Sequence, residues 1–316
     1  MDFKDVLNAH QLYKRKAKKV VVISSVTAIC LLIAVFAISR VSSFLDVFFY
    51  ISIVMLFMIF YAIILIFFIT NKEAKAYKLA YKTYFVEKSL RQTFTDIHYD
   101  HEAGLERDAL IDTQMINVGD SYTSNDYFTG KYKDVTFAQA DAHIQVKRSD
   151  GEGNTSYITI FKGRFMIFEF PKKFNFRLEV VEKGFRAARL PGEDAKTGRK
   201  IKRIELESDE FNRSFKTYAE DDFEAFYLLG PDFINNILDL NHEYEASFML
   251  GFLDNRLLIG LNDGKDAFEA PGVFKELDEA VETEKVTKDI RLITNFIDKL
   301  KLDHKLFKET RKDKNE

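Results

Sequence analysis

Hydrophobic residues fill two long stretches near the start of the chain. No charged side chain interrupts residues 20–39, VVVISSVTAICLLIAVFAIS, or residues 47–70. As α-helices these stretches would measure roughly 30 and 36 Å, enough for a hydrocarbon core of about 30 Å. Two buried core helices are the alternative, but a soluble domain seldom needs such long uncharged runs. The pattern predicts a transmembrane helical hairpin at residues 20–70.

The charged residues around these stretches predict an orientation. Basic residues cluster before the first stretch, at 14–19, and after the second, at 72–82, whereas the turn between them holds only Arg40, close to Asp46. Cytoplasmic flanks carry the excess of Lys and Arg. We therefore expect a two-span protein of the cell membrane, in contact with bilayer lipid, with both termini in the cytoplasm.

A helical pattern continues beyond the second stretch. Residues 72–94 keep helical spacing, with Tyr77, Tyr81 and Tyr84 near one face, and a second helix is predicted at 104–116. One helix alone cannot bury all of these tyrosines. We expect the two helices to pack as an antiparallel pair within a stalk, residues 71–118. A free tether, or burial of the rings against another subunit, is the alternative.

From about residue 126 the hydrophobic period becomes that of β-strands. The predicted strands are rich in β-branched and aromatic residues. They lie at 127–132, 135–146, 157–161, 164–170, 176–181 and 201–206.

Glycine and asparagine positions suggest how these strands connect. Lys162–Gly163 separates two apolar runs, so we interpret it as a tight hairpin turn, and Asp254–Asn255 is interpreted in the same way. A phosphate-binding loop at Gly163 would need more glycine and a following helix, which the sequence lacks. Direct hairpins predict a mainly antiparallel sheet.

Two later segments have the spacing of amphipathic helices. One begins at Pro231 and covers 230–240, and the other covers about 283–300 with an apolar stripe. The predicted fold class is α+β, two N-terminal transmembrane helices followed by a cytoplasmic domain with flanking helices. The predicted divisions are a basic N-terminus at 1–19, the hairpin at 20–70, the stalk at 71–118, the domain at 119–302 and a charged tail at 303–316.

Composition excludes several classes of function. The 316 residues carry a net charge of −3 and a single cysteine, Cys30, so no disulfide or thiol pair forms. The predicted spans contain no ionisable residue that would mark an ion path. The sequence lacks the concentrated basic patch that a nucleic-acid-binding protein would have, so we expect no nucleic-acid partner. We expect no cofactor and no metal.

The segment 206–212, LESDEFN, is the strongest candidate for a ligand or partner site. Glu207, Glu210 and Asn212 could line such a site, while Phe211 would anchor the segment in the core. A purely structural corner is the alternative for these residues.

Two other polar clusters have simpler explanations. Residues 98–102, HYDHE, offer imidazoles and carboxylates, but their spacing matches no established metal site and a solvated linker explains them. Residues 219–224, AEDDFE, could supply a catalytic base, yet acids before a helix also complement its dipole. No activated serine or cysteine nucleophile is visible.

Several of these motifs together resemble a known family. FKGRFMIFEFPKKF, then IELESDEFNRSFKTY and YLLGPDFINNIL, are similar to the bacterial domain-of-unknown-function family numbered 3137, over about residues 99–302. The resemblance implies an N-terminal membrane hairpin joined to a cytoplasmic domain. It implies no activity, cofactor or catalytic residue.

Two functions from different classes remain. The sequence favours a membrane-tethered binding or scaffold protein that recognises a protein partner or lipid headgroups, and that forms a homo-oligomer if the partner is a second copy. The alternative is a membrane-surface enzyme using the acidic residues at 207–210 and 220–222. Catalysis is therefore left open, and the choice rests on the absence of a recognisable catalytic set.

Overall fold

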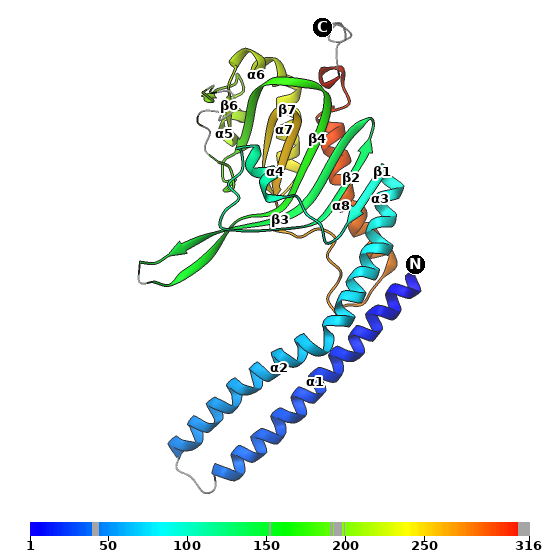
Figure 1. The fold of residues 1–316 in the computed structure, drawn as a ribbon, viewed down its shortest axis with the longest axis vertical. Helices are drawn as coiled ribbons and strands as arrows, with labels where there is room; N and C mark the ends of the chain where they lie inside the picture. The colour runs from blue at the N-terminus through cyan, green and yellow to red at the C-terminus, as the bar shows by residue number, and fades with distance from the viewer. Residues whose placement is uncertain (40–43, 152, 190–191, 193–197, 199, 309–316) are drawn as a thin grey trace. The chain divides into compact units, whose positions relative to one another are not determined.

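The computed structural model describes residues 1–39, 44–151, 153–189, 192, 198 and 200–308, except the side chains of 34–35, 37–39, 44–50, 62 and 64–70 (Figure 1). The predicted turn at 40–43 and the predicted tail from 309 onward lie outside the described residues. The chain divides into two compact units. Unit 1 comprises Met1–Lys88 and Glu269–Lys285, and unit 2 comprises Ser89–Phe268 and Val286–Glu316.

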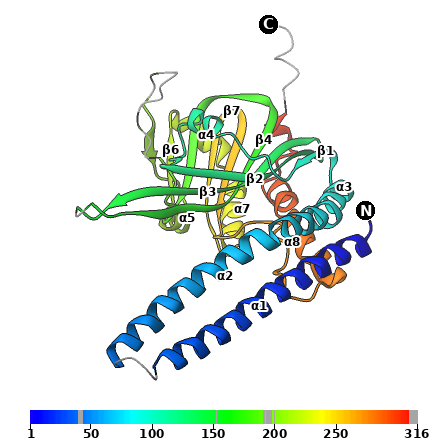
Figure 2. The ribbon, with the colours of Figure 1, turned by 60° about the horizontal axis from the view of Figure 1, so that its bottom comes forward.

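Unit 1 is built on two long helices that lie side by side. They are α1 (Phe3–Ser39) and α2 (Phe44–Tyr81), and a π-helix, η1 (Lys82–Glu87), continues α2 (Figures 1 and 2). Near the beginning of α1 and the end of α2 the helices share aromatic contacts, such as His10 against Tyr77 at 4.9 Å between ring centroids. An ion pair of 2.7 Å joins Lys16 of α1 to Glu73 of α2.

The predicted membrane spans are not supported. Within the described part of the chain, no helix joins sufficient length to sufficient apolar character to cross a bilayer. We therefore correct the predicted spans at 20–39 and 47–70, together with the localisation and orientation based on them.

Tyr77 and Tyr81 are buried and Tyr84 is half-buried, but against a different partner from the one expected. Tyr77 donates to the carbonyl of Pro271 at 3.3 Å, and Tyr81 donates to Glu282 at 2.7 Å. Tyr84 donates to Glu279 and contacts Phe3 of α1. Rings on α1 and the segment 269–282 supply these contacts within unit 1. The predicted pairing with residues 104–116 is wrong, because that segment packs in unit 2.

Unit 2 contains a sheet of 7 strands, and every strand pairing in it is antiparallel among the described residues. The strand order is β1-β2-β3-β4-β6-β5, and β7 pairs with β4. The α+β character and the antiparallel sheet agree with the sequence patterns. The strands are β1 (Thr95–Asp100), β2 (Ser121–Tyr132), β3 (Val135–Ser149), β4 (Thr155–Glu182), β5 (Lys202–Ile204), β6 (Phe215–Ala219) and β7 (Ser247–Asn262).

Short helices fill the connections of unit 2. They are α3 (Lys88–Thr93), which begins at the last residue of the first segment of unit 1, and α4 (Arg107–Asp112), α5 (Asp209–Ser214), α6 (Asp222–Leu228), α7 (Pro231–Glu243) and the 3₁₀ helix η2 (Lys305–Phe307). The last long helix, α8 (Glu279–Lys299), belongs to unit 1 up to Lys285 and to unit 2 from Val286. The predicted helices at 230–240 and 283–300 are thus confirmed as α7 and α8.

Both predicted hairpin turns are wrong, because each lies inside one long strand. Lys162–Gly163 is part of β4 and Asp254–Asn255 is part of β7, and these two strands pair along most of their length. A Cβ at Gly163 would lie 2.0 Å from the carbonyl oxygen of Leu261, so glycine permits a close approach of β7. Asp254 has a φ of 54° where the pairing register shifts, which marks a bulge.

The sheet is covered on both faces within unit 2. On one side, called the α4 face, Leu110 and Met115 pack with Ala140, Phe161 and Phe165 in one apolar cluster. Side chains of alternate positions point to the other side, the α8 face. There Phe248 of β7 contacts Phe296 of α8, and Phe252 contacts Phe233 of α7. Burial on both faces explains why the central strands carry nearly continuous apolar runs.

Candidate functional site

The residues predicted to form a ligand or partner site surround helix α5. Glu207 and Glu210 are exposed, and Glu210 lies 3.8 Å from His242 in a surface ion pair. Asn212 closes a loop instead: its side chain accepts from the Leu206 amide at 3.1 Å and donates to the Leu206 carbonyl at 2.6 Å. The Asn212 side chain therefore has a structural use, and a ligand or partner role for the three residues stays a prediction.

The other sequence candidates have local structural roles. In the segment 98–102, Asp100 accepts from the amides of Glu102 and Ala103, and these hydrogen bonds lower the pKa of its carboxyl. Asp221 of the segment 219–224 caps α6 by accepting from the Glu224 amide at 3.1 Å. The Asp100 arrangement is that of a turn, and the Asp221 arrangement is that of a helix start.

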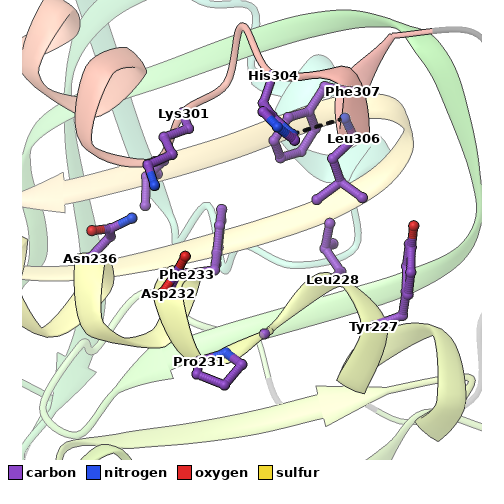
Figure 3. A pocket seen from close by; sticks show the side chains of 12 residues that line it. Tyr227, Leu228, Pro231, Asp232, Phe233, Asn236, Lys301, His304, Leu306 and Phe307 are labelled. Atoms are coloured by element: carbon purple, nitrogen blue, oxygen red, sulfur yellow. Dashed lines mark hydrogen bonds between the residues drawn. The ribbon is translucent and has the colours of Figure 1, made fainter.

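A pocket of about 430 Å³ lies in unit 2, where α6 meets α7 beside the segment that follows α8 (Figure 3). This volume falls in the range of small-molecule and side-chain binding pockets. Local sequence builds one wall, because Asp221 starts α6 and Pro231 at the first turn starts α7 shortly after α6 ends. The opposite wall contains Lys301, His304, Leu306 and Phe307.

The interior of the pocket is apolar and its rim is polar. Leu228, Phe233 and Phe307 line it and are themselves buried, so their positions are fixed by the core. Phe307 stacks on Phe170 of β4 at 4.7 Å between ring centroids. The His304 side chain accepts a hydrogen bond from the Leu306 amide at 3.3 Å (Figure 3). This bond orders the turn that carries Leu306 and Phe307.

Some polar side chains at the rim are available to a ligand. Figure 3 shows Asn236 of α7 and Lys301 on opposite sides of the opening, with Asp232 on the α7 side. Within the described part of the chain, these side chains form no hydrogen bond or ion pair. Asp232 stands in the first turn of α7, where a carboxylate complements the helix dipole. Asn236 and Lys301 have no comparable intramolecular explanation.

Helix α6 displays three large aromatic side chains next to this pocket. Phe223 is 79% exposed, Phe226 47% and Tyr227 62%. The other face of the helix is anchored, since Ala225 and Leu228 are buried. Tyr227 also lines the pocket, and the ammonium of Lys172 lies 5.9 Å from its ring centroid. The pocket and the outer face of α6 together form what we call the aromatic pocket surface.

A larger cleft, of about 700 Å³, lies beside α8 and is lined mainly by polar and charged residues. Several of its groups already have partners: Lys299 nearby pairs with Glu243 at 2.6 Å, and Asn295 donates to Glu243 and to Tyr244. Because this cleft lacks the apolar lining that is typical of ligand pockets, it is a weaker candidate than the pocket beside α6.

Sequence reasoning did not find the aromatic pocket surface. The run FEAFY at 223–227 follows the acidic cap of α6 and contains all three exposed rings. On a single helix those rings could equally belong to the core, and periodicity cannot tell the two situations apart. The second wall comes from residues more than sixty positions later, so the pocket depends on tertiary structure.

Comparison with known proteins identifies the later part of the chain. Residues 159–302 match the sequence profile of the family described as Protein of unknown function (DUF3137). The match covers a little under half of the chain and agrees with the resemblance seen in the sequence. The DUF3137 segment contains α6, α7 and the pocket residues up to Lys301, whereas His304, Leu306 and Phe307 lie beyond it. The family description assigns no activity.

A solved structure also matches, at low similarity. The crystal structure of the mycobacterial trehalose monomycolate transport factor A, TtfA, shares 13% sequence identity and a TM-score of 0.35. The match covers 71% of this chain and 94% of that chain. At this score the likeness supports no argument about function. Comparison with curated proteins gives no match.

Proposed function

We propose that the chain is a binding protein whose aromatic pocket surface takes an apolar side chain of a protein partner. The observation that carries the proposal is a pocket with a buried apolar lining and open polar groups, placed beside three exposed aromatic rings. Protein interfaces are enriched in aromatic anchors that fill such pockets, with polar groups at the rim. This is the binding role that the sequence favoured, without the membrane anchor.

Exposure of the α6 rings supports a protein surface as the occupant. Large aromatic side chains each bury about 150–250 Å² when they are covered. Phe223, Phe226 and Tyr227 are displayed by a helix whose inner face is fixed, so they form a rigid patch beside the pocket. Contiguous exposed apolar surface of this kind marks an interaction site.

Charged residues around the pocket indicate which residues of the partner lie next to the side chain that enters it. Lys301 borders it on the side after α8, and Lys172 lies near Tyr227. Asp232 is accounted for by the dipole of α7, so these basic groups set the charge of the rim. We therefore expect a partner segment with an aromatic or aliphatic anchor next to acidic residues.

The enzymatic alternative gains no specific support from the geometry. Glu207 and Glu210 are exposed on a surface loop and helix, and Asp221 is engaged as a helix cap. A catalytic acid or base would be expected within reach of a pocket that holds a substrate. None of these three residues lines the pocket described above.

Photocrosslinking in cells tests the proposal. A photoreactive phenylalanine analogue replaces Phe226 in one variant and Tyr157, which is 54% exposed on β4, in a matched control. We expect a discrete adduct with one polypeptide from position 226 and not from position 157. A pocket substitution, Leu306→Asp, should abolish the adduct while the far-ultraviolet circular dichroism of the chain is unchanged.

Other outcomes of this experiment would reject the proposal. An adduct of lipid mass would indicate headgroup or acyl-chain binding. An adduct of twice the chain mass would assign the surface to contact between copies. The same products from positions 226 and 157, or an adduct that survives Leu306→Asp, would show that the pocket does not select a partner.

A further inference from the structure

Three aspartates from separate segments of unit 2 meet in one small volume. Asp126 lies on β2, Asp141 on β3, and Asp266 in the loop after β7. One carboxylate oxygen of each lies within 4.8 Å of the others. Asp126 is 0% exposed, Asp141 is 3% exposed, and Asp266 is half-buried. The carboxylates are therefore close together and largely removed from water.

The positive charge that faces Asp141 is shared with other carboxylates. Arg164 of β4 is opposite Asp141 in the strand register, but its guanidinium is engaged elsewhere. It donates to the carboxylate of Asp289 at 2.9 Å and lies 3.4 Å from that of Asp263. An arginine that already faces two carboxylates cannot neutralise three more. A carboxylate as deeply buried as that of Asp141 is strongly unfavourable without a counter-charge of its own, so this position requires a cation or a proton.

Neutral donors hold the carboxylates in position. Tyr99 donates to Asp126 Oδ1 at 2.5 Å, and the Asn125 amide donates to Asp126 Oδ2 at 2.8 Å. The backbone amide of Ala267 donates to Asp141 Oδ2. These bonds orient the oxygens but add no positive charge. The hydrogen bonds therefore fix the positions of the carboxylate oxygens and leave their negative charge in place.

One oxygen of the cluster has no partner among the described residues. Asp141 Oδ1 is buried and accepts no hydrogen bond. Burial, and then the neighbouring carboxyl of Asp266, raise the pKa of Asp141 well above its ordinary range. Buried polar atoms in native proteins nearly always have a partner, and a bound ion can account for an exception.

A second unpartnered side chain lies on the same strand face. Gln139 is two positions before Asp141 on β3, is 1% exposed, and has no hydrogen-bond partner at either amide atom among the described residues. Residues two apart on a strand point to the same side of the sheet. The unsatisfied polar surface thus extends from Asp141 along β3, and does not depend on the acidic residues alone.

We propose that Asp126, Asp141 and Asp266 bind a hard divalent cation, Ca²⁺ or Mg²⁺. The cluster offers only oxygen ligands, which these ions prefer, and no histidine or cysteine that zinc would favour. Ca²⁺ takes its ligands at about 2.3–2.6 Å, so oxygens on opposite sides of the ion stand roughly 5 Å apart. Three oxygens within 4.8 Å of one another are therefore close enough to bind one such ion together.

Such an ion would join three segments that are far apart in the sequence. It would tie β2 and β3 to the loop after β7, next to Phe268, whose ring contacts Phe128 of β2 at 6.0 Å. Asp266 lies just before Glu269, where the chain leaves unit 2. The cation would thus fix the end of the first segment of unit 2 against its sheet.

Thermal unfolding of the purified full chain, followed by circular dichroism, tests the site. After treatment with a chelator, Ca²⁺ or Mg²⁺ alone is added at neutral pH. At about 100 times the dissociation constant, we expect the melting temperature to rise by about 5–10 °C. The rise should be absent in Asp141→Asn and in Asp266→Asn, and elemental analysis of the dialysed wild-type chain should give about one bound ion per chain.

The controls separate a specific site from general ionic effects. Asp222→Asn removes an exposed carboxylate of α6 and should keep the full response. Asp266→Asn is the variant to rely on if Asp141→Asn fails to fold, because Asp266 is only half-buried. The ion that gives the larger shift identifies the preferred metal. No shift in the wild type with either ion, or an equal shift in Asp266→Asn, would overturn the proposal and leave protons as the source of neutralisation.

Discussion

Two groups of buried charges lie on opposite faces of the same sheet and differ in how they are balanced. On the α4 face, Arg177 donates through Nε to Glu179 at 2.7 Å, and its Nη2 lies 2.6 Å from the same carboxylate. On the α8 face, Asp126, Asp141 and Asp266 gather three carboxylates, and Asp141 Oδ1 has no hydrogen-bond partner among the described residues. Arg177 and Glu179 are only 2% and 0% exposed, so both groups are comparably buried.

The difference shows two ways in which a fold can tolerate buried carboxylates. The α4 face supplies its own counter-ion from the same strand, and Arg177 also donates to the carbonyl of Gln114 at 2.8 Å. The α8 face gathers acids from three segments and leaves neutralisation to something outside the chain. A built-in pair supplies its cation from the chain, whereas an open cluster makes the folded state respond to added metal.

The largest effect is expected from removing the built-in cation. Arg177→Met should lower the free energy of unfolding by about 3–5 kcal/mol, because Glu179 would stay buried without its partner. Urea unfolding at neutral pH measures the loss. The exposed pair of Arg203 and Glu205, 3.3 Å apart, supplies the matched control, and Arg203→Met should change the value by less than about 1 kcal/mol.

A double replacement sharpens this result. Arg177→Met combined with Glu179→Leu should recover much of the loss, since replacing both partners by apolar groups removes the uncompensated charge. If Arg177→Met alone were tolerated within about 1 kcal/mol, the two faces of the sheet would not differ in the way described here.

A smaller effect is expected from pH. Burial raises the pKa of Glu179 from 4.5 to about 7 even though Arg177 opposes the shift. The folded state therefore binds this proton more tightly than the unfolded state. The resulting stability is fully present below about pH 4.5 and is lost as the pH rises through about 7, with an amplitude of at most a few kcal/mol.

Replacing the group isolates its contribution. Glu179→Gln should flatten the fall in unfolding free energy between pH 4.5 and 7, as measured by urea unfolding at a series of pH values, whereas the exposed Glu207→Gln should leave the profile unchanged. Because the pKa of Asp141 is also raised, the difference between wild type and variant is the quantity to compare. Parallel profiles for wild type and Glu179→Gln would contradict the assignment.

The smallest effect concerns Gln139 on the open face. Gln139→Met keeps the volume of the side chain and removes an amide that has no partner among the described residues, so it should stabilise the chelator-treated chain by about 1 kcal/mol. Urea unfolding provides the measurement. A loss of stability instead would show that the amide is engaged in the folded state, and would weaken the contrast between the faces.

Local sequence signals predicted many elements of unit 2 correctly. The start of α7 at Pro231 and the apolar stripe of α8 follow from capping and periodicity over neighbouring residues. Ser208, which accepts from the Phe211 amide, likewise starts α5 within the LESDEFN segment. These features depend on contacts within one or two helical turns, so the sequence contains all the information that decides them.

Other features depended on residues that are distant along the chain. The sequence around Gly163 fits a turn as well as a strand, and only the approach of Leu261 on β7 decides for the strand. The spacing of the tyrosines in α2 and η1 predicted that another segment packs against them. It did not identify α1 and residues 269–282 as that segment. Nonlocal pairing chooses between alternatives that are locally equivalent.

The sequence by itself determined the caps of the short helices and the helical stripe of α8, since each depends on neighbours in the chain. Tertiary structure alone brought Asp126, Asp141 and Asp266 together, and placed the segment after α8 against α6 and α7. The physical reason is the same in both places. A carboxylate or an aromatic ring acquires its chemistry from burial and from the charges around it, and the fold sets both.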